Sequence, residues 1–192
     1  AALSGQDIRT VDRGRLARQR AVVAQTSALT FPFQSYEVAS MGRAPHLGRT
    51  TRQVDPEIVH EAIRKMDVTH PAARNYLTLS GGERKRVDIA RALAQVWEAP
   101  EAGGTRWLFL DEPTAALDLK YQISLMRELQ DLKQKGWGIV AVLHDLHLVK
   151  KFADHVWLLK NGKVEAIGEA KSVLTAERIQ SVFELDAPYT LP

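Results

Sequence analysis

Short, nearly continuous apolar runs recur along the chain and predict β-strands. They occupy residues 21–24, 107–110, 138–143 and 156–159. Runs of this kind are typical of central parallel strands that helices cover on both faces, whereas a sheet with one wet face shows alternation. The pattern therefore predicts an α/β fold with a doubly wound parallel layer.

Longer segments between these runs repeat at helical spacing. Asp55 and Pro56 open one of them as an N-cap and a first-turn proline, and apolar residues follow at positions 58, 59, 62, 63 and 66. A second helix is expected from Gly82 to about position 97, and a third over residues 120–135, ending at Gly136. Three helices thus accompany the strands.

The region between Gln25 and Leu79 is helical in pattern, with turns and without a convincing strand. We therefore expect a helical insertion in the α/β layer. The proline and paired glycines of residues 98–105 predict a loop before the second strand.

Composition narrows the functional classes. The 192 residues, 45% of them hydrophobic, suit one domain with its own core, and no run of about 18 uncharged apolar residues predicts a membrane span. The chain has no cysteine, which excludes disulfide scaffolds, zinc knuckles and thiol catalysis. A formal charge of +3 is too small to indicate a nucleic-acid partner.

Polar residues follow three of the predicted strands. Gln25 follows the first, Asp111 and Glu112 the second, and His144 and Asp145 the third. Ligands of open parallel sheets bind at the carboxyl ends of the strands, so these side chains are expected to converge. A carboxylate there can hold Mg²⁺ beside a phosphate, and its neighbour can polarise a water molecule. The alternative is a strand-to-helix turn in which the aspartate is a cap.

Residues 79–83, LSGGE, also have two interpretations. Ser80 and Glu83 have the spacing of a capping box, which starts a helix well. The paired glycines Gly81 and Gly82 also leave backbone N–H groups open to an anion, as a phosphate site requires. The basic residues that follow, Arg84-Lys85-Arg86 with Arg91, are most simply the solvated face of that helix.

Four segments in this order resemble the motifs of an ATP-binding-cassette (ABC) ATPase. They are Gln25 as the Q-loop, LSGGERKRVDIARAL (79–93) as the signature, WLFLDEPTAALD (107–118) as Walker B with the D-loop, and VLHDL (142–146) with the switch histidine. The resemblance implies a P-loop NTPase-type parallel sheet with helices on both faces. It also implies an inserted helical subdomain, here residues 26–105, between α/β-core segments 1–25 and 106–192.

Within this superfamily the chain is most similar to the ATP-binding subunit of bacterial haem (hemin) importers. The resembling features are FPF at 31–33, MGRAPH at 41–46 and the loop EAPEAGGT at 98–105. ATPases of ferric-siderophore and cobalamin importers share much of the second feature, so these substrates remain alternatives.

A P-loop of the form G-x-x-x-x-G-K-[ST] does not occur in the 192 residues, where the one Gly-Lys pair is Gly162-Lys163. Because residues 2–8 resemble the strand that follows the P-loop helix in this family, we expect the chain to begin after that unit. As it stands it is expected to be inactive.

The resemblance implies ATP and Mg²⁺ as cofactors and assigns a role to each site residue. Asp111 binds Mg²⁺, Glu112 is the general base, Gln25 contacts metal and water, and His144 hydrogen-bonds the γ-phosphate. Residues that complete the ATP site of the opposing subunit in a head-to-tail homodimer are Ser80, Gly81, Gly82 and Asp118.

The implied setting is the cytoplasmic face of a bacterial inner membrane, where the ATPase pair binds a permease dimer and serves a periplasmic substrate-binding protein indirectly. Residues 25–46 would face the permease, with Phe31, Phe33 and Tyr36 as a docking surface or, alternatively, as a small core of the helical subdomain. Two other functions remain open. One is a soluble ABC ATPase of DNA repair or translation, which usually has coiled coils or tandem cassettes. The other is a catalytically inactive cassette that docks on permeases as a regulatory module.

Overall fold

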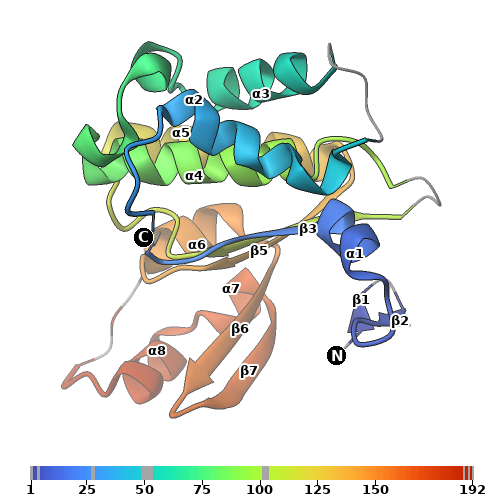
Figure 1. The fold of residues 1–192 in the computed structure, drawn as a ribbon. Helices are drawn as coiled ribbons and strands as arrows, with labels where there is room; N and C mark the ends of the chain where they lie inside the picture. The colour runs from blue at the N-terminus through green and yellow to red at the C-terminus, as the bar shows by residue number, and fades with distance from the viewer. Residues whose placement is uncertain are drawn as a thin grey trace. The chain divides into compact units, whose positions relative to one another are not determined.

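The computed structural model describes residues 2–3, 5–26, 29–48, 54–100, 104–187, 189 and 191, which form two compact units, 1–142 and 143–192. Figure 1 shows the elements of both. The strands of the first unit are β1 (Ala2–Leu3), β2 (Gln6–Asp7), β3 (Arg20–Val23), β4 (Arg106–Asp111) and β5 (Trp137–Val142). Its helices are α1 (Arg13–Gln19), α2 (Ser35–Ser40), α3 (Val54–Lys65), α4 (Gly81–Gln95) and α5 (Leu119–Gln134), with short 3-10 turns at Met41–His46, His70–Ala73 and Tyr76–Thr78.

A parallel sheet in the order β3-β4-β5 forms the centre of the first unit. All three strands were predicted from their apolar runs. One face carries Ala21, Val23, Leu108 and Leu110, all buried. On the other face Val22, Val140 and Val142 are about half exposed, so in these 192 residues the sheet is not covered equally on both faces.

Helices α2, α3 and α4 pack together as the predicted helical insertion, above the sheet in Figure 1. Helix α3 begins at Val54, so Asp55 lies inside the first turn, and the N-cap predicted for it is wrong. Its carboxylate instead accepts a hydrogen bond from Arg43 Nε at 2.7 Å. Residues 101–103 of the predicted loop lie outside the described residues.

The second unit differs from the sequence prediction in one respect. It contains α6 (Leu146–Phe152), β6 (His155–Lys160), β7 (Lys163–Glu169), α7 (Ala170–Val173) and α8 (Ala176–Phe183). Strand β6 pairs antiparallel with β7, so residues 156–159 are not the central parallel strand that their apolar run predicted. Val156 and Leu158 are buried, whereas Trp157 and Leu159 are 68% and 58% exposed.

Candidate functional site

Gln25 and Asp111 lie at the same edge of the parallel sheet. Val23, the last residue of β3, pairs with Leu110, and Asp111 follows directly as the last residue of β4. Gln25 comes two residues after β3 ends, so both side chains belong to the carboxyl edge, where ligands of parallel sheets bind. Both residues are exposed.

Glu112 has a backbone conformation that few non-glycine residues adopt. Its φ is +44°, in the left-handed region, and its N–H donates to the carbonyl of Val142 at 3.2 Å across the edge of β5. Such conformations cost about 1–3 kcal/mol and cluster at functional sites. The capping alternative for Asp111 is wrong, because the aspartate that caps the next helix is Asp118, whose Oδ1 accepts from the N–H of Tyr121 at 3.1 Å.

The donor set at this edge suits Mg²⁺. The ion prefers oxygen ligands, keeps several water molecules, and is usually held by one or two carboxylates together with substrate phosphates. Asp111 offers a carboxylate and Gln25 an amide oxygen, both open to solvent. No cluster of three or more His, Asp or Glu side chains capable of holding a metal occurs in the described part of the chain.

His144 follows the end of β5 by two residues and belongs to the second unit. It is exposed. The next residue, Asp145, caps α6 by accepting from the N–H groups of His147 and Leu148 at 2.8 and 3.2 Å. Because His144 and Glu112 belong to different units, the expected convergence of their side chains stays a prediction.

The capping-box interpretation of residues 80–83 is confirmed. Ser80 Oγ accepts from the N–H of Glu83 at 3.2 Å, and Glu83 Oε2 accepts from the N–H of Ser80 at 2.8 Å. The backbone hydrogen bond from Ser80, opposed by partial burial, lowers the pKa of Glu83. Because Gly81 and Gly82 are the first two residues of α4, their N–H groups have no acceptor within the helix. Capping and anion binding are thus compatible.

Gly82 packs against the segment that precedes α5 in the same chain. A Cβ built on Gly82 would lie 2.8 Å from the carbonyl oxygen of Ala116, closer than real Cβ contacts come. A Cβ on Gly81 would meet only the Cβ of Ala116, at 3.5 Å. The start of α4 and the segment leading to Asp118 are therefore in close contact.

The solvated-face interpretation of the basic run is wrong for two of its residues. Arg84 is exposed, but Lys85 and Arg86 are only 7% and 8% exposed. Arg86 donates to the carbonyls of Met66 and Asp67, at 3.2 and 2.5 Å, and its guanidinium lies 3.8 Å from the ring centroid of Tyr121. Helix α4 turns by about 100° per residue, so three consecutive side chains cannot share one face.

Sequence reasoning missed a buried cluster around Arg43, in the MGRAPH segment. Arg43 donates to the carbonyl of Ala94 at 2.7 Å and pairs with Asp55 and Glu98. His46 Nε2 lies 2.8 Å from the carbonyl of Gln95. The segment therefore contacts and stabilises the last turn of α4. The sequence feature that indicates this cluster is the pair Arg43 and His46, two polar residues at helical spacing beside Pro45.

The aromatic residues Phe31, Phe33 and Tyr36 were expected to form either a docking surface or a small core, and the structure separates them. Phe31 is 67% exposed and suits a docking surface rather than a core. Tyr36 is half-buried and its ring contacts that of His60 on α3, with centroids 5.1 Å apart, so it packs within the helical region. Phe33 is half-buried beside Phe31.

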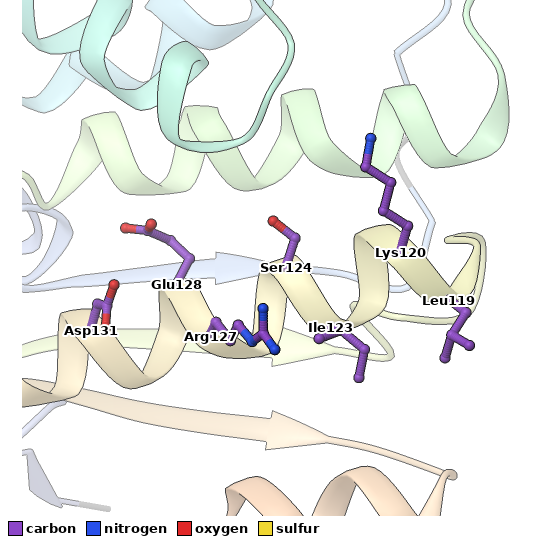
Figure 2. A pocket seen from close by; sticks show the side chains of 7 residues that line it. All are labelled: Leu119, Lys120, Ile123, Ser124, Arg127, Glu128 and Asp131. Atoms are coloured by element: carbon purple, nitrogen blue, oxygen red, sulfur yellow. The ribbon is translucent and has the colours of Figure 1, made fainter.

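A groove runs along α5, and neither Gln25 nor Asp111 lines it (Figure 2). Its lining mixes the cations Lys120 and Arg127 with the anions Glu128 and Asp131, so it lacks the uniform charge that a polyphosphate needs. Glu128 pairs with Lys65 of α3. No helix in the described ranges is long and apolar enough to cross a membrane.

The sheet edge, the glycine-led helix and the inserted helices define a nucleotide-binding cassette. Residues 1–115 match the family described as ABC transporter. A hemin import ATP-binding protein of Hahella chejuensis (strain KCTC 2396) is 41% identical over 186 residues, which cover 96% of this chain and 71% of that protein. The chain belongs to the ABC transporter family.

Solved structures agree on the fold. A metal-chelate type ABC transporter in an inward-facing conformation is 29% identical with a TM-score of 0.74, covering 86% of this chain and 64% of that one. A bacterial ABC transporter cassette, solved as a dimer, is 25% identical with a TM-score of 0.68, covering 83% and 68%.

Proposed function

We propose that this chain is the ATP-binding subunit of a bacterial hemin importer and that ATP is hydrolysed at the edge formed by Gln25, Asp111 and Glu112. The observation that carries the proposal is the strained backbone of Glu112 beside Asp111 at the carboxyl edge of the sheet. The hemin assignment rests on the similarity to a hemin import ATP-binding protein over 96% of the chain.

In this proposal each predicted site residue has one task. Glu112, whose backbone is held in the left-handed region, accepts the proton of the attacking water. Asp111 and Gln25 hold Mg²⁺, which when bound neutralises charge on the transferring phosphate. His144 donates a hydrogen bond to the γ-phosphate.

The second half of the site comes from a partner subunit in a homodimer. Ser80, Gly81 and Gly82 offer a hydroxyl and two amides to the partner's γ-phosphate, and Asp118 crosses the same interface. The dimeric cassette at 25% identity supports this arrangement. The pair would bind a permease dimer at the cytoplasmic face of the membrane through residues 25–46, with 26–105 acting as the helical subdomain and 1–25 and 106–192 as the α/β core. A ferric-siderophore or cobalamin importer is the alternative.

The test of the base is Glu112→Gln in a version of this protein that includes a P-loop, a motif that the 192 residues do not contain. Nucleotide binding should stay near normal, while turnover stops and an ATP-bound dimer accumulates, because a general base acts only in the transition state. Hydrolysis at the wild-type rate would exclude Glu112 as the base.

The test of the shared site compares two substitutions of Ser80 in the same protein. Ser80→Ala removes the cap and should cost about 1 kcal/mol of stability. Ser80→Arg should abolish hydrolysis while each subunit still folds and binds ATP. Mixed with the Glu112→Gln protein, it should regain some activity, since one site of the heterodimer then lacks neither group. Absence of recovery in covalently linked heterodimers would contradict the assignment.

The substrate is tested by expressing the protein with its permease and binding protein in proteoliposomes. Hemin-loaded binding protein should stimulate ATP hydrolysis, whereas binding proteins loaded with a ferric siderophore or cobalamin should not. Stimulation by either of the latter alone would reassign the transporter.

A further inference from the structure

Lys85 is a buried lysine. Within the part of the chain that the structure describes, its ammonium group donates to main-chain carbonyls. The residue lies on α4, five residues after Ser80, and is 7% exposed. Its ammonium donates to the carbonyl of Ala24 at 3.1 Å and to that of Gln25 at 2.8 Å. A lysine is rarely buried to this extent without a partner, so these two bonds explain where its charge is stabilised.

The two carbonyls stand on either side of the Gln25 Cα. The oxygen of Ala24 belongs to the peptide plane that precedes Gln25, and the oxygen of Gln25 belongs to the plane that follows. Because peptide units are planar, a donor that binds both oxygens restricts the combinations of φ and ψ open to Gln25, and with them the direction of its Cα–Cβ bond. One ammonium group therefore constrains the backbone from which the Gln25 side chain projects.

The contact lies at the point where the chain leaves β3. Along a strand, successive carbonyls point in opposite directions. Two successive carbonyls that share one donor require the chain to leave this geometry, and the backbone bends at Gln25, two residues after the last strand residue, Val23. The bend and the burial of Lys85 are thus two consequences of one contact.

We propose that Lys85 is a positioning residue that orients Gln25 and ties it to α4. The inference rests on the proposed function only in giving Gln25 a part in hydrolysis. Since Ser80 caps α4 and Gly81 and Gly82 begin it, a displacement of this helix moves the Gln25 backbone with it. Lys85 acts on turnover through Gln25 and touches neither nucleotide nor water.

The contact itself is tested in the 192-residue chain by NMR of labelled carbonyls. Gln25-Thr26 is the single Gln-Thr step in the sequence, so ¹³C-carbonyl glutamine with ¹⁵N-threonine isolates the Gln25 carbonyl. Ala-Gln occurs twice, at 24–25 and 94–95, so the corresponding alanine labelling gives two signals. The Ala94 carbonyl accepts from Arg43 and serves as an internal control.

Lys85→Met should move the Ala24 and Gln25 carbonyl signals upfield and leave that of Ala94 in place. The matched control is Arg84→Met, which removes a neighbouring cation that donates to the carbonyls of Leu77 and Leu79 and should move neither signal. Unmoved Ala24 and Gln25 signals in Lys85→Met would overturn the proposal. If that variant does not fold, Lys85→Leu carries the same comparison, because it also removes the donor.

The effect on hydrolysis is tested with a double-mutant cycle in the version of the protein that includes a P-loop. Lys85→Met should lower kcat on the order of 10- to 100-fold, with KM for ATP nearly unchanged, as expected for a misplaced catalytic group. In a Gln25→Ala background the same change should cause no further loss. Independent, multiplicative losses would refute action through Gln25. If Gln25→Ala alone leaves turnover intact, the role proposed for Gln25 fails, while the carbonyl signals still decide whether the contact exists.

Discussion

Gly82→Ala should destabilise the first unit, whereas Gly81→Ala one residue earlier should not. The new methyl group at position 82 would lie 2.8 Å from the carbonyl oxygen of Ala116 and 3.4 Å from Leu117 Cδ2, so backbone must move to admit it. At position 81 it would make an ordinary contact with Ala116. Neither glycine has a positive φ, so backbone conformation does not separate the two positions.

The magnitude follows from two opposing effects. Alanine favours a helix over glycine by up to about 1 kcal/mol, and this gain applies to both positions. Overpacking costs about 1–3 kcal/mol and applies to position 82 alone. The difference in unfolding free energy between the two variants therefore isolates the steric cost, and we expect Gly82→Ala to be less stable than Gly81→Ala by about 1–3 kcal/mol.

Urea unfolding followed by tryptophan fluorescence measures this difference. Three of the four tryptophans, Trp97, Trp107 and Trp137, lie in the first unit, and replacing the exposed Trp157 by phenylalanine in every variant confines the signal to that unit. Equal transition midpoints for the two alanine variants would refute the close packing of Gly82. If the two variants do differ, a loss of ATPase activity in Gly82 variants can come from destabilisation. Such a loss then gives no evidence that Gly82 binds phosphate.

Three further outcomes are expected. Because Ser80 lowers the pKa of Glu83 in the folded state, the capping box stabilises the fold above about pH 4.3 and loses this contribution as pH falls through the folded pKa. Glu83→Gln should then be less stable than wild type at pH 7, with the gap in urea midpoints closing on acidification. Burial raises the pKa of Asp88, so the stability of the wild type falls as pH rises from about 3.9 through the pKa of the folded state. Asp88→Asn still accepts a hydrogen bond from the Tyr76 hydroxyl and should remove this pH dependence. Its urea midpoint at pH 7 should match or exceed that of the wild type. The 192-residue chain should show no ATP turnover and only weak ATP binding by calorimetry, since it contains no P-loop motif; turnover abolished by Glu112→Gln would contradict this.

The parallel sheet could be predicted because its strands are apolar on both sides of the backbone. Strand β6 has the same appearance for a different reason, since Trp157 and Leu159 are apolar but exposed. Its partner β7 was missed because charged residues and Gly168 interrupt it. Pairing with a neighbouring strand, rather than its own pattern, makes it a strand.

The candidate site was predictable to the extent that its residues end strands. Gln25 and Asp111 reach one edge because parallel strands end together, and this follows from topology alone. The left-handed conformation of Glu112 was not predictable, because glutamate has no preference for it and only the surrounding contacts impose it.

The buried cations were beyond sequence reasoning for a more general reason. Lys85 donates to carbonyls where β3 ends, Arg86 to carbonyls just past the end of α3, and Arg43 to a carbonyl in the last turn of α4. Ends of helices leave carbonyls without backbone partners, and cations are favoured there. The pattern of charged residues in a sequence can indicate pairs of oppositely charged side chains. It cannot indicate which main-chain carbonyls lack a backbone partner, because every residue has a carbonyl. A basic run within a helix therefore looks solvated in the sequence, although two of its members, Lys85 and Arg86, donate to carbonyls at the ends of other elements.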